Sequence, residues 1–152
     1  MNSLGELDRI DRKILAELQA EGRLAITGLA ERVGLSKTPC QQRVKRLEEA
    51  GFIRGYAALL DLEKLGAGHV AFVEVKLNDT RDQALAAFNK AVLRLPEVEQ
   101  CHMIAGDFDY LLKVRTRDIA DYRRVLGEAL SALPHVANTS TFVVMESVKE
   151  RV

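Results

Sequence analysis

Residues 36–51 read S-K-T-P-C-Q-Q-R-V-K-R-L-E-E-A-G, and they predict a helix with signals at both of its ends. Ser36 predicts the N-cap of a helix, because its hydroxyl can accept a hydrogen bond from a free N–H of the first turn. Gly51 suits the left-handed position that closes a helix. Between these ends, apolar residues recur at i, i+4 and i+7 and predict one buried stripe. The stripe consists of Cys40, Val44 and Leu47.

The opposite face of this predicted helix carries amide and cationic side chains. Gln can bond adenine bidentately, whereas Arg and Lys can read guanine or hold a phosphate. No acidic residue occurs from Ser36 to Leu47, so the face suits the major groove of DNA. An ordinary solvated helix face is the alternative. The candidate DNA-binding residues are Lys37, Thr38, Gln41, Gln42, Lys45 and Arg46.

Two shorter helical patterns precede this helix. Asp8 predicts the N-cap of the first, which ends near Gly22. The second opens near Thr27, which we expect to cap it, and stops at Gly34. A short Gly-containing turn then leads into the third helix, which is the arrangement of a helix-turn-helix. This order favours DNA binding over a generic three-helix unit.

Composition narrows the function classes. The chain has 152 residues, of which 47% are hydrophobic and 29% charged, so we expect a packed core rather than disorder. A formal net charge of zero excludes a polybasic nucleic-acid coat. The two cysteines show no metal-binding spacing, and no apolar run approaches the roughly 20 residues of a membrane span. Because no signal-peptide pattern occurs at the N-terminus, we expect a soluble, cytoplasmic protein without membrane contact.

The second half of the chain has a different pattern. Residues 52–60 are β-like and predict a wing or a strand that pairs with another subunit. A linker at 61–67 follows, with Gly66 inside it and Gly68 directly after it. Alternation of apolar and polar residues predicts four strands, at 69–77, 98–104, 108–116 and 136–145. Two helices are expected between them. One is capped by the turn at 78–80, and the other is capped by Asp118 and has Ile119 facing inward.

This order of elements, βαββαβ, predicts a ferredoxin-like sandwich. The fold class is therefore α+β. We expect a helix-turn-helix domain at residues 1–60, the linker at 61–67 and a ferredoxin-like domain, which also mediates oligomerisation, at 68–152. The helices should cover one face of the sheet. We expect the other face to be apolar and open, which favours a two-fold dimer.

Several strings in the two halves match one family in order and spacing. They are L-D-R-I-D-R-K-I-L (7–15), V-G-L-S-K-T-P-C (33–40), R-V-K-R-L-E (43–48), G-F-I-R-G-Y (51–56), G-D-F-D-Y-L-L-K (106–113) and V-V-M-E-S-V-K (143–149). In these strings the chain resembles the leucine-responsive/asparagine-regulator (Lrp/AsnC) family of bacterial transcription regulators, and most of all its leucine-responsive branch. Lys37 and the Gln41-Gln42 pair depart from the family pattern, so the operator sequence does not carry over from relatives.

The resemblance implies an N-terminal helix-turn-helix domain, a hinge and a ferredoxin-like effector domain. It also implies homodimers that assemble into a larger ring, typically an octamer, with double-stranded DNA wrapped outside. Small amino acids are expected to bind where the effector domains of neighbouring dimers meet. The resemblance implies neither a catalytic residue nor a metal, and no cofactor other than the amino-acid effector.

The G-D-F-D-Y turn and the start of the last strand match the effector region of this family. Asp109 can pair with the ammonium of an amino acid, while N–H groups of the turn and threonine hydroxyls can hold the carboxylate. Without the resemblance, a plain hairpin turn is the favoured interpretation of Gly106-Asp107, and the resemblance reverses this preference. The candidate effector-binding residues are Gly106, Asp107, Phe108, Asp109, Tyr110, Asn138, Thr139 and Thr141.

Three functions compete at this point. The first is a sequence-specific transcription regulator whose assembly and DNA binding respond to a small, leucine-like amino acid, and which controls amino-acid metabolism genes. Its variant is a pathway-specific activator or repressor of amino-acid catabolism, for example of proline or branched-chain amino acids. The second is a ferredoxin-like enzyme using His102, Asp107 and Asp109, which no nucleophile, phosphate-loop or zinc motif accompanies. The third is a sensor that acts through protein partners, against which the basic helix argues. We therefore expect a regulator and no enzyme.

Overall fold

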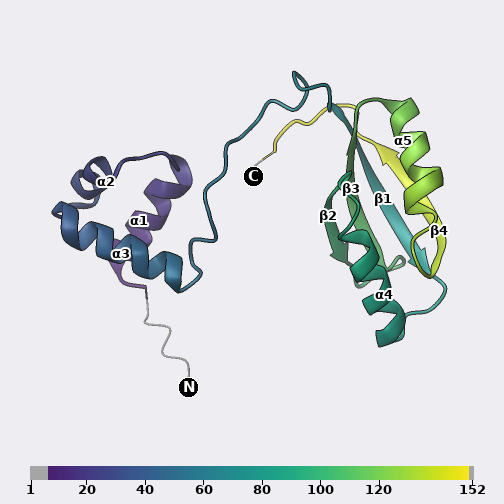
Figure 1. Cartoon of the computed structure of the whole chain (residues 1–152), viewed down its shortest axis with the longest axis horizontal. Coiled ribbons are helices and arrows are strands. Elements are labelled where there is room, and N and C mark those ends of the chain that lie inside the picture. The colour runs from purple at the N-terminus through teal and green to yellow at the C-terminus, as the bar shows by residue number, and fades with distance from the viewer. Residues whose placement is uncertain (1–6, 151–152) are drawn as a thin grey trace. The chain divides into compact units, whose positions relative to one another are not determined.

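The structure is a computed structural model that describes residues 7–150 (Figure 1). The chain divides into two compact units, one ending at Leu59 and the other beginning at Leu60. The first unit holds three helices, α1 (Arg9–Ala20), α2 (Ile26–Val33) and α3 (Lys37–Glu49). Their apolar stripes meet in one core, as the sequence predicts. The buried residues of this core are Ile14, Leu29, Ala30, Val33, Cys40, Val44 and Leu47.

The ends of the three helices follow the predicted signals in most places. Asp8 caps α1, and its carboxylate accepts from the backbone N–H of Asp11 at 2.8 Å. Gly34 ends α2 with φ of 76°, a left-handed conformation that strains residues with a Cβ. The predicted cap at Thr27 is wrong, because Ala25 adopts the extended N-cap backbone and Thr27 lies inside α2. Ser36 is the N-cap of α3 by backbone conformation, but its hydroxyl makes no capping hydrogen bond within the described chain.

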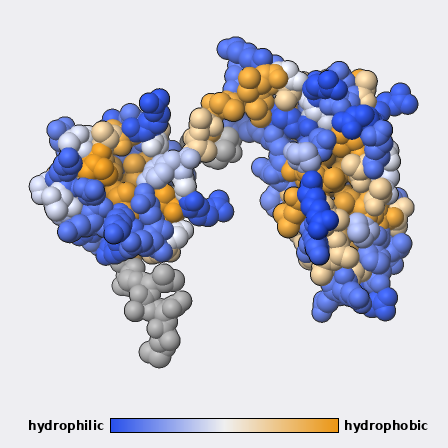
Figure 2. Space-filling view, viewed as in Figure 1, coloured by the Kyte–Doolittle hydropathy of each residue, from blue (hydrophilic) through white to orange (hydrophobic). Residues whose placement is uncertain are grey.

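The segment after α3 differs from the prediction of a wing or strand. Residues 54–60 form no strand in the described part of the chain, because no neighbouring segment offers them backbone hydrogen bonds. Pairing with another subunit stays a prediction. Tyr56, Leu59 and Leu60 are 52%, 75% and 63% exposed. Figure 2 shows hydrophobic side chains at the surface along this connection.

The second unit is a four-stranded antiparallel sheet with helices on one face (Figure 1). The strands lie in the order β2-β3-β1-β4. This order, with the βαββαβ succession, confirms the ferredoxin-like prediction. The elements are β1 (His69–Leu77), α4 (Asp82–Val92), β2 (Val98–Met103), β3 (Tyr110–Thr116), α5 (Ile119–Val125), a π-helical turn η1 (Leu126–Leu130) and β4 (Val136–Val143).

The core of this unit lies between the sheet and the helices. Val73 and Val75 of β1 and Leu112 of β3 are fully buried there against Phe88 of α4. Two helix predictions are wrong. α4 has Arg81 as its N-cap, so the turn at 78–80 does not cap it. Ile119 is 53% exposed, because it opens the first turn of α5 and faces solvent there.

The prediction of an apolar open sheet face is also wrong. Phe72 lies there, but its neighbour across the strand pair is Lys113, and Glu74 faces Leu111. Charged side chains thus alternate with apolar ones on the two central strands. Ion pairs stabilise these charged side chains on the sheet. Lys113, for example, is only 8% exposed and pairs with Glu99 and Glu150. Strand alternation alone could not reveal these partners, which come from distant segments.

Candidate nucleic-acid interface and effector site

The two sides of α3 differ as the sequence predicts. Its apolar stripe is buried, with Cys40 at 0%, Val44 at 6% and Leu47 at 1% exposure. Burial in this apolar stripe raises the pKa of the Cys40 thiol, so packing is its role. All six candidate DNA-binding residues lie on the exposed part of the helix. They are Lys37, Thr38, Gln41, Gln42, Lys45 and Arg46.

The cationic side chains of α3 differ in how firmly they are held by ion pairs. The ammonium of Lys45 is 3.6 Å from the carboxylate of Glu49 one turn on, an exposed pair of the kind that contributes little. Arg46 is 57% exposed, yet its Nη2 lies 2.5 Å from Oδ2 of Asp11 on α1. Arg43 donates to Asp8 at 2.5 Å and to Asp11 at 2.9 Å. Lys45 is therefore free to turn toward DNA, whereas the two arginines are already engaged.

This pairing shows in the titration of the groups involved. The pKa of Asp8 is lowered, chiefly by the hydrogen bond from the Asp11 backbone N–H and then by the one from Arg43. The pKa of Arg43 is raised by its hydrogen bonds to the carboxylates of Asp8 and Asp11. Asp8 and Arg43 are therefore both charged at neutral pH, as their ionic contact requires.

In the second unit, the structure gives Asp109 internal partners. Its carboxylate accepts from the backbone N–H of Leu77 at 2.7 Å and lies 3.9 Å from the ammonium of Lys76. Its own N–H donates to the carbonyl of Val75 at 2.9 Å. The side chain is 17% exposed. Asp109 thus ties the β2–β3 hairpin to the end of β1.

Tyr110 is likewise part of the core. It is 2% exposed, its hydroxyl donates to Asn89 Oδ1 at 2.7 Å, and its ring lies 4.3 Å from that of Phe88. Burial is the main reason that the pKa of Tyr110 is raised. Its alternation with the fully buried Leu112 and Val114 puts it on the same, inward face of the strand. Tyr110 therefore cannot reach a ligand without repacking.

Three of the eight candidate effector residues line one hollow on the open face of the sheet. These are Asp107, Phe108 and Asn138, around a space of about 330 Å³. The ammonium of Lys76 donates to the Asp107 carbonyl at 3.1 Å. Sequence reasoning missed the other residues that line the hollow, although strand alternation puts them on this face. They are Glu74 and Lys76, while Ser140, which also lines the hollow, lies in the strand start that matches the family's effector region.

The remaining candidates do not join this hollow as one site. Thr139 and Thr141 are paired with Val75 and Val73, whose side chains point to the helix-covered face. The hydroxyl of Thr141 lies 2.5 Å from that of Tyr122 on α5. Because successive residues of a strand point to opposite faces, Asn138 and the two threonines cannot converge on one small ligand from this strand.

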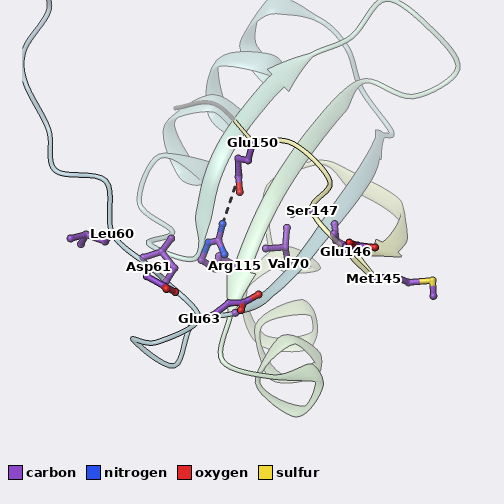
Figure 3. A pocket seen from close by; sticks show the side chains of 12 residues that line it. Leu60, Asp61, Glu63, Val70, Arg115, Met145, Glu146, Ser147 and Glu150 are labelled. Atoms are coloured by element: carbon purple, nitrogen blue, oxygen red, sulfur yellow. Dashed lines mark ion pairs between the residues drawn. The ribbon is translucent and has the colours of Figure 1, made fainter. Parts of the chain in front are cut away.

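A second hollow, of about 200 Å³, lies between the linker turn and the C-terminal segment (Figure 3). Arg115 projects into it, and its Nη2 lies 3.9 Å from the Glu150 carboxylate. Asp61, Glu63 and Glu146 also line it. Across residues 7–150, no group of three or more His, Cys, Asp or Glu side chains is arranged to hold a metal ion. No helix among these residues is long and apolar enough to cross a membrane.

Comparisons with known proteins agree with this architecture. Residues 7–54 match the model of a winged helix-turn-helix DNA-binding domain, and residues 70–152 match that of the Lrp/AsnC ligand binding domain. A DNA-binding unit joined to a ligand-binding unit defines a ligand-responsive transcription regulator. Since the second model alone covers more than half of its residues, the chain belongs to the Lrp/AsnC family.

The relatives of known name that are similar to this chain include proline dehydrogenase transcriptional activators and leucine-responsive regulatory proteins. A proline dehydrogenase transcriptional activator of Rhizobium radiobacter is 63% identical over 95% of this chain and 93% of its own length. The leucine-responsive regulatory protein of Escherichia coli K12 is 53% identical over 95% of this chain and 88% of its own length. These relatives are transcription regulators.

A solved structure of a Neisseria meningitidis transcriptional regulator in complex with L-Met is similar in fold. It superposes with a TM-score of 0.89 at 38% identity, over 95% of this chain and 93% of that one.

Proposed function

We propose that this regulator recognises specific DNA sequences with α3 and that its DNA binding responds to a small amino acid. The observation that carries the DNA-binding part is the exposed face of α3, where amides and lysines lie opposite a fully packed stripe. Gln41 and Gln42 read base edges, and Lys37, Thr38 and Lys45 contact phosphates or bases. Arg46 stays with Asp11. The protein acts on bacterial DNA, in the cytoplasm, and not as an enzyme.

The proposed effector site is the hollow on the open face of the sheet. A zwitterionic amino acid needs an anion for its ammonium and a cation for its carboxylate. The carboxylates of Glu74 and Asp107 can pair with the ammonium of the ligand, and the ammonium of Lys76 can pair with its carboxylate. Phe108 adds an aromatic surface to the same hollow, suited to an apolar side chain. Asp109 supports the hollow from behind by fixing the hairpin to β1. Gly106 precedes Asp107 in the chain, whereas Tyr110, Thr139 and Thr141 face the helix-covered side of the sheet and do not line the site.

We propose two alternative sets of regulated genes, based on the names of the similar proteins. A leucine-like effector and a regulon of amino-acid metabolism agree with the leucine-responsive relatives at 53% identity. A second candidate is an activator of one catabolic pathway, that of proline. It is favoured by the 63% and 59% identity to two proline dehydrogenase transcriptional activators.

We further propose that the chain forms a homodimer that assembles into a larger ring. Large apolar side chains exposed in the single chain support self-association. Leu59, Leu60 and Leu65 on the connection are 75%, 63% and 64% exposed, and Phe142 on β4 is 53% exposed. Sedimentation of the full chain tests this proposal. A monomer at micromolar concentration contradicts it.

The central experiment measures binding of the full chain to DNA from upstream of its own gene and to a scrambled duplex of equal length. We expect tighter binding to the upstream DNA, and a shift in that binding with leucine, proline or methionine. The variant Lys76→Gln should bind the upstream DNA normally without effector and lose the effector response. Lys90→Gln on α4, which lies outside the hollow, is the matched control. Equal affinity for both duplexes contradicts the sequence-specific part.

A retained effector response in Lys76→Gln contradicts the site assignment. The identity of the effective amino acid separates the two regulons. A response to proline alone favours the pathway-specific activator, and a response to leucine favours the leucine-responsive role.

A further inference from the structure

Four charged side chains form a closed ionic cluster at the joint between α1 and α3. Asp8 and Asp11 belong to the first turn of α1 and its cap, and Arg43 and Arg46 belong to the middle of α3. Arg43 bridges both carboxylates, and Arg46 donates to the second oxygen of Asp11. The cluster has no net charge, and every member has at least one partner within it.

Asp11 is the centre of this cluster. Its side chain is only 1% exposed, so its carboxylate depends on the cluster for hydrogen bonds in place of water. One oxygen accepts from Arg43 at 2.9 Å, and the other accepts from Arg46 at 2.5 Å and from the Asp8 backbone N–H at 3.2 Å. Removing a partner from a buried charge is strongly unfavourable. The arginines are therefore held more firmly than in an exposed surface pair.

The position of the carboxylates adds to this hold. Both lie at the N-terminus of α1, where free backbone N–H groups and the helix dipole stabilise negative charge. Asp8 and Asp11 each accept from the backbone N–H of the other. The anionic half of the cluster is thus fixed to α1 before any DNA approaches, and the arginines reach it from α3.

We infer that Asp8 and Asp11 withhold Arg43 and Arg46 from DNA phosphates and position the recognition helix. Phosphate contacts provide affinity for any sequence, whereas base contacts provide specificity. Withholding two of the four cations on α3 lowers the affinity for non-specific DNA and leaves Lys37 and Lys45 as the phosphate-binding groups. The net result is a higher ratio of specific to non-specific binding. This inference rests on the proposed DNA-binding role of α3.

The test is a salt titration of the full chain on a scrambled duplex, with two neighbouring substitutions compared. Each phosphate contact contributes about 0.9 to the slope of log K against log salt. Lys45→Gln should therefore reduce the slope by about 0.9, whereas Arg46→Gln should leave it unchanged. Asp11→Asn keeps the size of the side chain and removes its charge. It should steepen the slope by about 0.9 for each arginine that it releases.

Each outcome decides the inference. Arg46→Gln lowering the slope as much as Lys45→Gln overturns it, because Arg46 then binds phosphate in the native protein. An unchanged slope in a folded Asp11→Asn variant overturns it as well. If Asp11→Asn fails to fold, the comparison of Arg46→Gln with Lys45→Gln decides alone, because Asp11 keeps its hydrogen bonds from Arg43 and from the Asp8 backbone in Arg46→Gln. Absence of DNA binding in the unmodified chain is a different result, and it refutes the proposed function instead.

Discussion

The carboxylate of Asp109, the residue before β3, accepts a hydrogen bond of 2.7 Å from the backbone N–H of Leu77, at the end of β1. The pairing of β1 with β4 shifts register between Lys76 and Leu77. Asp109 therefore supplies an acceptor at an irregular place in the sheet. This contact gives the residue a structural role next to the proposed effector hollow.

Replacing Asp109 with Ala should destabilise the second unit. The change leaves the Leu77 N–H at a mostly buried position without its acceptor, which costs roughly 1–3 kcal/mol. Asp109→Asn keeps an oxygen at this position and should lose less. Denaturant unfolding followed by circular dichroism measures the difference. Unchanged stability with a lost effector response would instead identify Asp109 as a direct ligand to the ammonium.

Replacing Gln42 with Ala should relax base preference at one operator position. Gln42 lies on the exposed face of α3 opposite the buried stripe, where its amide can read a base edge. We expect discrimination at that position to fall by roughly 1–3 kcal/mol, with the salt slope unchanged. A selection from randomised duplexes measures this preference. Gln19→Ala, an exposed glutamine on α1, is the control, and an equal loss on all sequences would place Gln42 on the phosphates.

Replacing Gly34 with Ala should weaken the helix-turn-helix. Gly34 has φ of 76°, and a left-handed conformation costs a residue with a Cβ roughly 1–2 kcal/mol. Apart from its own chain neighbours, no atom of residues 7–150 lies within 4 Å of the added methyl group, so the cost is conformational. Gly22→Ala is the matched control, because Gly22 lies outside the left-handed region and its new methyl would have only ordinary contacts. Thermal unfolding compares the two, and equal melting temperatures contradict the prediction.

The second unit should lose stability in acid partly through Asp121. Hydrogen bonds from Arg117 first, and then from Arg124, lower its pKa from 3.8 to about 2. Since the folded pKa is the lower one, the unfolded chain takes up the proton first as the pH falls. The stabilisation is therefore complete above about pH 3.8 and is lost between that value and about 2.

The variant Asp121→Asn should have a flatter dependence of stability on pH across this window. Urea midpoints at a series of pH values measure it. Because the side chains of Arg117 and Arg124 are exposed, added salt should reduce the difference between the variant and the native chain. A profile for Asp121→Asn that follows the native one at low salt would show that the ion pairs do not act on stability.

Much of the fold could be predicted because it follows local periodicity. The i, i+4, i+7 spacing placed Cys40, Val44 and Leu47 inward, and strand alternation placed β1 at its observed bounds. The wrong predictions are at positions where the local sequence pattern is not sufficient to determine the structure. Thr27 is a good capping residue, but the backbone turns two residues earlier, at Ala25. Residues 52–60 have the composition of a strand, but a strand forms only where a partner supplies hydrogen bonds.

The sequence by itself determined the two classes of unit, the buried and exposed sides of α3 and the order of strands and helices, because each depends on neighbours within a few residues. Only the tertiary structure decided which charges are engaged. Arg46 meets Asp11 across 35 residues of sequence, and Asp109 meets Leu77 across 32. It also decided that Asn138 lies at the hollow while Thr141 faces α5. Such contacts arise from the packing of distant segments. The local sequence pattern therefore does not predict which charged side chain contacts which partner.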